Sequence, residues 1–74
     1  MPRLPSIRPE EVARVARRLG FIRDRQKGSH AVFLRHSDRR RVVIVMHRRE
    51  LKRGTLRSLI SDLGISVEKF LDLL

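Results

Sequence analysis

Three histidines are the residues of this 74-residue chain whose side chains best suit proton transfer. Histidine changes its protonation near neutral pH, so it can both accept and donate a proton. His30 follows a short basic turn, Lys27-Gly28-Ser29, in which the glycine lets the backbone approach a phosphate closely and the lysine can bind that phosphate. Judged by spacing alone, a histidine at the start of a strand is more often an ordinary surface residue. Catalysis by His30 is therefore a hypothesis at this point.

The chemistry that fits such a turn is cleavage of RNA without a metal ion. The 2′-OH attacks the adjacent phosphodiester, a base takes the hydroxyl proton, an acid protonates the leaving 5′-oxygen, and cations stabilise the charged phosphorane. His30 is the candidate for proton transfer. His47 either exchanges the second proton or only orients its loop, and His36 is interpreted as a surface residue that contacts phosphate.

Other reaction classes are disfavoured by residues that the chain lacks. The absence of cysteine excludes a disulfide framework, a thiolate zinc site and a thiol nucleophile. The histidines do not have the HExxH spacing, and the acidic residues are too scattered for a two-metal nuclease. We therefore expect neither a metal site nor a cofactor.

The charge of the chain points to a polyanionic partner. Lys and Arg number 18 against 8 Asp and Glu, for a formal net charge of +10. Because 41% of the residues are hydrophobic, the chain can form a core and is not a disordered basic tail. Nucleic acid is the leading partner, although an anionic membrane, an acidic protein or a purely solubilising role is also consistent with the charge. Aromatic residues make up only 4%, which argues against a platform that stacks successive bases.

The elements that must position these residues follow from periodicity and breakers. We expect a helix from Pro9 to Gly20, a short strand over 21–26, a hairpin of strands 30–36 and 41–47, a helix capped by Thr55 that ends at Gly64, and a short helix from Ser66. This α-β-β-β-α order with an extra C-terminal helix predicts an α+β domain over residues 1–74. Helices would pack on one face of a three-stranded antiparallel sheet, as in the double-stranded RNA-binding domain.

The expected hairpin makes two further predictions. A turn centred between Asp38 and Arg39 pairs residues whose numbers add to 77, which places His30 opposite His47. Both sheet faces are then apolar in mid-strand, although helices cover only one of them. The uncovered face predicts a docking surface for another protein or for a second copy of the chain.

The location of the protein is also predicted from apolar segments. No secretory segment follows Met1, and the longest apolar run, Val42 to Met46, is too short to span a bilayer. We expect a cytoplasmic protein that does not enter a membrane.

Two groups of residues resemble the signatures of the HicA-type toxins. The first is Gly28-Ser29-His30 with Val32-Phe33 and His36-Ser37-Asp38; the second is His47 with Glu50-Leu51-Lys52 and Gly54-Thr55-Leu56-Arg57. Residues 62–70 fit as well, so the resemblance covers nearly the whole chain. The sequence departs from the family pattern in the hairpin turn, which has no glycine, and at Met46, where a proline is common.

This resemblance implies an mRNA interferase, a toxin that cleaves messenger RNA without metal and arrests translation. It also implies a HicB-type antitoxin that binds and inhibits the toxin, and it assigns catalysis to His30, with Gly28 and Ser29 as motif neighbours. The main alternative is a non-catalytic double-stranded RNA-binding module with the same fold. A DNA-binding regulator and a protein-interaction domain with incidental charge are further alternatives.

Overall fold

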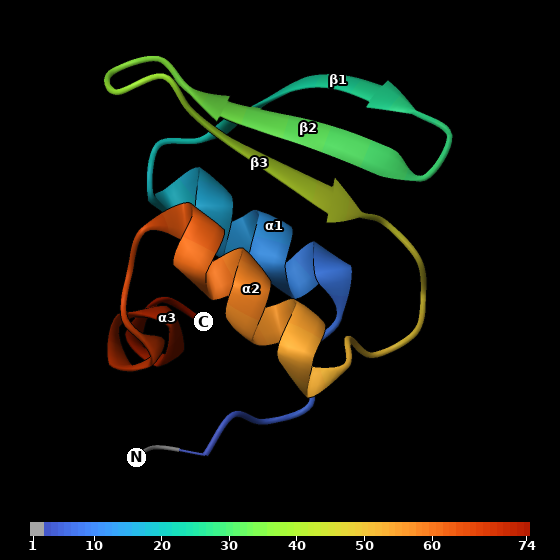
Figure 1. Cartoon of the computed structure of the whole chain (residues 1–74), viewed down its shortest axis with the longest axis vertical. Helices are drawn as coiled ribbons and strands as arrows, with labels where there is room; N and C mark the ends of the chain where they lie inside the picture. The colour runs from blue at the N-terminus through green and yellow to red at the C-terminus, as the bar shows by residue number, and fades with distance from the viewer. Residues whose placement is uncertain (1–2) are drawn as a thin grey trace.

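The structure is a computed structural model that describes residues 3–74. In chain order its elements are α1 (Pro9–Arg18), β1 (Ile22–Lys27), β2 (His30–Arg35), β3 (Arg40–Val45), α2 (Arg53–Leu63) and α3 (Val67–Leu73) (Figure 1). The α+β class and the element order are as predicted, and they are consistent with a fold like the double-stranded RNA-binding domain. Met1 and Pro2, which belong to the predicted domain and to the segment searched for a leader, lie outside the described residues.

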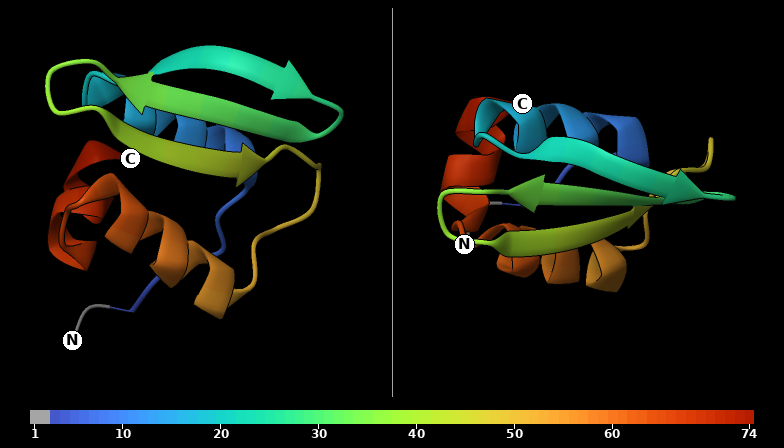
Figure 2. Two further views of the ribbon diagram at one scale, coloured as in Figure 1. Left: turned by 45° about the horizontal axis from the view of Figure 1, so that its top comes forward. Right: turned by 90° about the horizontal axis from the view of Figure 1, so that it is seen from above.

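The strands form an antiparallel sheet in the order β1-β2-β3, and α1 and α2 lie on the same side of it (Figure 2). The core fills the space between the sheet and the helices. Its buried hydrophobic residues are Leu4, Ile7, Val12, Ala13, Val15, Ala16, Phe21, Ala31, Phe33, Val42, Ile44, Leu56, Leu59, Ile60, Leu63 and Phe70. Among residues 3–74, no helix has the length and apolar character that crossing a membrane requires.

Helix α1 begins as the sequence predicts. Pro9 occupies the first helical turn, where its missing N–H is not needed. The backbone N–H of Arg8 donates to the Glu11 side chain at 3.0 Å, and this carboxylate lies at the positive end of the helix dipole. The helix buries Val12 and Val15 against the sheet, which fixes the side that faces the core.

The start of α2 differs from the prediction. The helix begins at Arg53 with Lys52 as its N-cap residue, so Thr55 lies inside the helix and does not cap it. Gly54 belongs to the first turn of the helix. Burial of Leu56 and Leu59 outweighs the cost of a helical glycine, which is about 1 kcal/mol. The other ends are as predicted: Gly64 ends α2 with φ +78°, and Ser66 Oγ caps α3 by accepting from the Lys69 N–H at 3.1 Å.

The N-terminal segment contributes to the core without forming a helix or strand. Leu4 and Ile7 are buried, and the Ile7 carbonyl accepts a hydrogen bond from the Leu51 N–H at 2.7 Å. This bond ties the start of the chain to the loop between β3 and α2. These two residues lie outside any periodic pattern, so their burial could not be predicted from the sequence.

The predicted register of the β2–β3 hairpin is wrong by two residues. His30 pairs with Val45, and β3 ends there, so His47 lies in the following loop and not opposite His30. The turn comprises residues 36–39 and is stabilised by Asp38, whose carboxylate accepts from the side chain of Arg35 and from the backbone N–H of Arg40. A shift of two residues keeps every side chain on its predicted face. The prediction of two apolar sheet faces is therefore unaffected.

Candidate functional site

The β1–β2 turn contains the residues predicted to bind and cleave RNA, and its backbone is held by hydrogen bonds. Lys27 pairs with His30 across a two-residue loop, Gly28-Ser29, and Gly28 adopts φ +59°, a conformation that glycine enters without strain. Both loop carbonyls are hydrogen-bonded: Gln26 Nε2 donates to Gly28 O at 3.1 Å, and the Met46 N–H donates to Ser29 O at 2.6 Å. The turn is thus held on both sides while its outer surface stays exposed.

His30 lies on the sheet face that points away from the helices. Its register partners are Lys27 on β1 and Val45 on β3, so the three side chains share one face with neighbouring Cβ atoms about 5 Å apart. The imidazole is exposed, and it makes no hydrogen bond within residues 3–74. The imidazole, with Lys27 as its register partner, is therefore accessible from solvent.

A second cation lies on the same strand and face. Arg25 pairs with Val32, next to the Lys27–His30 pair on the same face, because a bulge between Arg23 and Arg25 shifts the alternation of β1 by one residue. Its guanidinium forms an exposed ion pair with Asp24, with Nε 3.3 Å from Oδ2. Exposed pairs of this kind contribute little and exchange readily. Lys27 and Arg25 thus provide positive charge next to His30.

His47 contacts its own loop. Its Nδ1 accepts a hydrogen bond from the Arg49 N–H at 3.1 Å, so the proton of the neutral ring is on Nε2. The side chain lines a hollow of about 270 Å³ together with Arg8, Glu10 and Arg48. This arrangement fits the interpretation that His47 orients the loop, and its role in proton transfer stays a prediction.

His36 is not brought to the β1–β2 turn. It directly follows the end of β2, whereas His30 begins that strand, so the two lie at opposite ends of the sheet. Six residues of extended chain separate them by about 20 Å. Contact of one phosphate with both histidines is therefore not supported by this arrangement.

The outward face of the sheet is apolar and open. Ile22 is 54% exposed and Val45 is 38% exposed, the largest hydrophobic exposures among residues 3–74. We call this the outer sheet face; its apolar members are Ile22, Val32, Leu34, Val43 and Val45. As predicted, the helices do not cover it (Figure 2).

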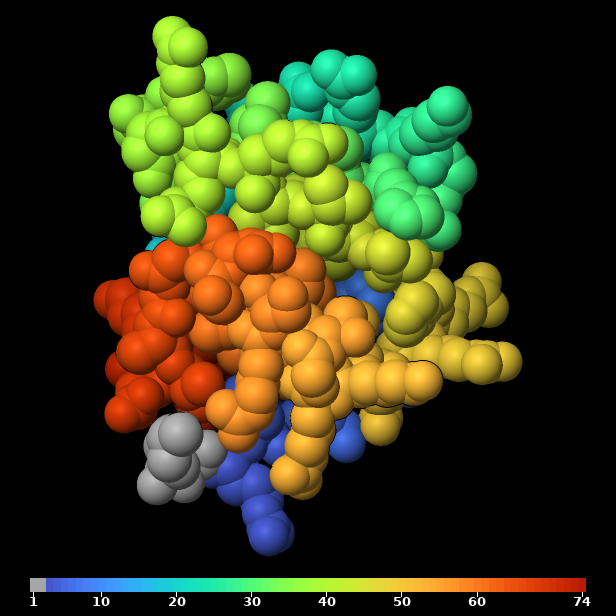
Figure 3. Space-filling model, in the orientation of Figure 1, coloured from blue at the N-terminus to red at the C-terminus, as the bar shows by residue number. Residues whose placement is uncertain are grey.

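A groove extends this face beyond the edge of β3. It has a volume of about 470 Å³ and lies between β3, the loop after it and the first turns of α2 (Figure 3). Val43 and Val45 line one side, and Leu51 and Leu59 supply apolar surface opposite. His47 is at its rim with Arg49, Glu50, Lys52 and Thr55. The outer sheet face and the groove together form a continuous surface next to His30.

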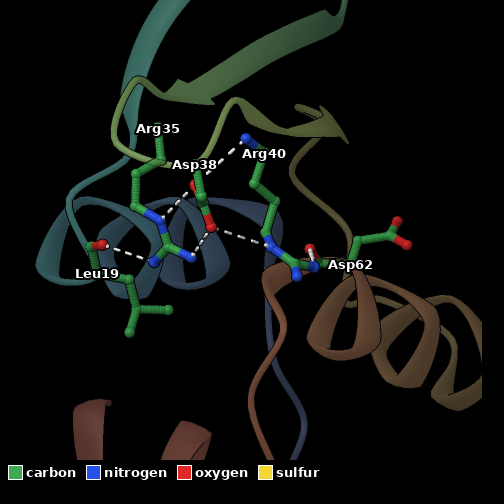
Figure 4. A network of polar contacts seen from close by, with 5 residues as sticks. All are labelled: Leu19, Arg35, Asp38, Arg40 and Asp62. Atoms are coloured by element: carbon green, nitrogen blue, oxygen red, sulfur yellow. Dashed lines mark hydrogen bonds and ion pairs between the residues drawn. The ribbon is translucent and has the colours of Figure 1, made fainter.

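The opposite end of the sheet carries a network of charged groups that the sequence analysis missed (Figure 4). Arg35 Nε and Nη2 donate to the two oxygens of Asp38 at 3.1 and 2.8 Å, and Arg40 Nε lies 3.6 Å from the same carboxylate. The hydrogen bonds from Arg35 hold the pKa of Asp38 well below its usual value, and Asp38 raises the pKa of Arg35. The two arginines also donate to carbonyls at helix ends, Arg35 to Leu19 at 2.9 Å and Arg40 to Asp62 at 3.1 Å. The network therefore ties the β2–β3 turn to α1 and α2.

Comparison with known proteins identifies the family of this chain. The profile of the family described as "HicA toxin of bacterial toxin-antitoxin" matches residues 9–65, well over half of the 74 residues. The chain belongs to the HicA toxin family. A search of the curated proteins found no match. Membership in the HicA family makes the chain the toxin of a toxin–antitoxin pair, with a cognate antitoxin as its partner.

The acidic and histidine side chains of this HicA toxin do not gather into a metal site. Within residues 3–74, no three of them come together in a group that could hold a metal ion.

Proposed function

We propose that this toxin is a metal-independent endoribonuclease that cleaves messenger RNA, with His30 in proton transfer. The observation that carries the proposal is the exposed imidazole of His30 directly opposite Lys27, at a glycine turn, in a chain of the HicA toxin family. The family resemblance assigns catalysis to this histidine, and the exposed position beside a cation supports that assignment.

In the proposed reaction a 2′-oxygen of the RNA forms a bond to the adjacent phosphorus while the bond to the 5′-oxygen breaks. The products are a 2′,3′-cyclic phosphate and a free 5′-hydroxyl, and no water is consumed. His30 accepts the 2′-OH proton, and Lys27 and Arg25 stabilise the charge that develops on the phosphorane. Gly28 and Ser29 let the backbone approach the phosphate, and the second proton comes from an acid that is either His47 or the solvent.

The first experiment is cleavage of a long single-stranded RNA by the purified chain in excess chelator. We expect the wild type to cut and to leave cyclic phosphate ends, and His30→Ala to cut about 10²–10⁴-fold more slowly, the usual contribution of a proton-transfer group. His36→Ala removes only the phosphate contact predicted for an exposed histidine at the other end of the sheet, and it should slow cleavage much less than His30→Ala. Equal cutting by wild type and His30→Ala would disprove the assignment, and circular dichroism must show both to be folded.

The antitoxin is the second part of the proposal. We infer that a HicB-type antitoxin docks on the outer sheet face and the adjoining groove, because this apolar surface is open and Val45 lies directly beside His30. An occupant there would cover the imidazole and block access of RNA. Val45→Asp places a carboxylate in that contact and should weaken antitoxin binding at least tenfold without unfolding the toxin, whereas Arg57→Gln on α2 should not.

A homodimer through the same face is the alternative occupant. Sedimentation of the isolated toxin distinguishes the two: a dimer that Val45→Asp dissociates would assign the face to a second copy. The non-catalytic double-stranded RNA-binding module is the alternative function, and the fold favours it as much as it favours the nuclease. It predicts RNA binding that tolerates His30→Ala and no cleavage by either protein.

A further inference from the structure

A hollow on the helix side of the sheet is lined by three arginines that the proposed reaction does not use. Its volume is about 370 Å³, and it lies between α1, β1 and the residue that follows β3. Arg14 and Arg17 come from α1, Arg23 comes from β1, and Glu10, Ala13 and Met46 complete the lining. Three arginines and one acidic residue, Glu10, thus line the hollow.

Two of these guanidinium groups are held by the same aromatic ring. The Cζ atoms of Arg17 and Arg23 lie 5.9 and 5.5 Å from the centre of the Phe33 ring, which is fully buried. Cations within about 6 Å of a ring are attracted to its face, so Phe33 orients both side chains. Preorganised arginines lose less conformational entropy when they bind a ligand.

The three arginines have no carboxylate partner of their own. The ion pairs formed within residues 3–74 involve only Asp24 and Asp38, and Glu10 is not paired with an arginine there. Three positive charges against one negative charge leave an excess that repels within the hollow, and an anion bound there relieves this repulsion. The planar fork of arginine fits the oxygens of a phosphate.

Hydrogen bonds connect the hollow to the β1–β2 turn. Arg23 Nη1 donates to Gln26 Oε1 at 2.8 Å, and Gln26 Nε2 donates to Gly28 O at 3.1 Å. Met46, which lines the hollow, donates its N–H to Ser29 O in the same turn. The hollow therefore lies on the inner side of the turn whose outer side presents His30.

We propose that this hollow binds a second phosphate of the RNA backbone, so that the strand passes around the β1–β2 turn with one phosphate at His30 and another at Arg17 and Arg23. The inference rests on the proposed function, because it takes RNA as the substrate. It adds a binding site on α1 and β1 that anchors the strand away from the bond to be cleaved. Gln26 is a positioning residue that links the two sites.

The test measures RNA binding in the His30→Ala background, in which the strand stays intact. The probe is a short fluorescent single-stranded RNA, titrated by anisotropy at several salt concentrations. Substituting both Arg17 and Arg23 by Gln should lower affinity at least tenfold and make the slope of log K against log salt shallower by about 1. The control replaces Arg57 and Arg53, exposed arginines of α2 outside the hollow, by Gln and should change affinity about twofold at most.

The outcomes separate the inference from the proposed function. If the wild type cleaves RNA but the hollow variant binds RNA as the α2 control does, the second phosphate site is disproved and the nuclease stands. If the hollow variant loses affinity for the antitoxin and not for RNA, the inference is again disproved. If the wild type neither cleaves nor binds RNA, the proposed function fails first.

Near-UV and far-UV circular dichroism of the hollow variant must match the parent, and Arg17→Lys with Arg23→Lys should restore the salt slope but only part of the affinity.

Discussion

The β1–β2 turn and the β2–β3 turn lie at opposite ends of the same sheet, and their polar side chains have different partners. At the β2–β3 end, Arg35, Asp38 and Arg40 bind one another and the carbonyls that end two helices. At the β1–β2 end, Lys27 and His30 point to solvent and make no side-chain hydrogen bond within residues 3–74. The β2–β3 turn stabilises the fold, while the β1–β2 turn leaves its polar side chains available to a ligand.

Two glycines show the same contrast. A Cβ atom on Gly28 would meet nothing within 4 Å, whereas a Cβ on Gly64 would lie 2.9 Å from Cζ of Arg40. The space at Gly64 is filled by the protein, and the space at Gly28 is open. Open space next to His30 and Lys27 is what the approach of a phosphate requires.

The largest effect that tests this comparison is expected for Gly28→Asn. Asparagine tolerates the positive φ of this residue, so the turn and the melting temperature should change little. Its side chain would occupy the space that we assign to the phosphate, so cleavage should fall between about tenfold and a hundredfold, as a misplaced substrate does. Unchanged cleavage in a folded Gly28→Asn would show that the phosphate does not approach the turn backbone.

The opposite pattern is expected for Arg35→Met at the other end of the sheet. Methionine keeps contact with the Phe21 ring, over which the Arg35 guanidinium lies at 4.7 Å, but it loses the bonds to Asp38 and to the Leu19 carbonyl. We expect the free energy of unfolding to fall by about 1 kcal/mol, measured by urea denaturation. Cleavage per folded molecule should equal that of the wild type. A drop in activity without a drop in stability would mean that the two ends are coupled.

The difference between the turns also explains what could be predicted from sequence. The turn predicted at Lys27-Gly28-Ser29 is present because Gly28 supplies the positive φ that it needs, although Lys27 is the last residue of β1 and the loop comprises only Gly28 and Ser29. The β2–β3 turn has no glycine, and its register depends on where Asp38 finds its partners, so the pairing of His30 with His47 was wrong. Helix α1, with proline at its start, was predictable, whereas the start of α2 depended on the burial of Leu56 and Leu59.

Contacts between distant parts of the chain could not be read from the sequence at all. Leu4 and Ile7 join the core through packing and one backbone bond to Leu51. The convergence of Arg17 and Arg23 on Phe33 depends on how α1 lies across the sheet. In the sequence, the arginines of α1 are indistinguishable from a solvated helix face.

A smaller effect at the β1–β2 end is expected for His47→Asn. Asn in its place can still accept the Arg49 N–H bond that Nδ1 accepts now, but it cannot transfer a proton at neutral pH. Since His47 does not face His30 across the strands, we expect His47→Asn to retain cleavage within about tenfold, in single-turnover assays with excess enzyme. A loss of a hundredfold or more, the scale of general acid catalysis, would assign the second proton to His47.

The smallest effect is expected for Asp38→Asn, and it depends on pH. Because the hydrogen bonds from Arg35 lower the pKa of Asp38 in the folded protein, its carboxylate stabilises the fold above the unfolded pKa of about 3.9. This contribution is lost as pH falls below that value toward the lower pKa of the folded state.

The melting temperature of Asp38→Asn should therefore lie a few degrees below that of the wild type at pH 6, and the two should converge below about pH 4. The two proteins differ only at residue 38, so the difference between them isolates Asp38. A gap that stayed constant down to pH 2 would show that Asp38 acts on the turn through its shape and not through its charge. In that case Asp38 would stabilise its turn through uncharged hydrogen bonds, as the backbone bonds do at the β1–β2 turn.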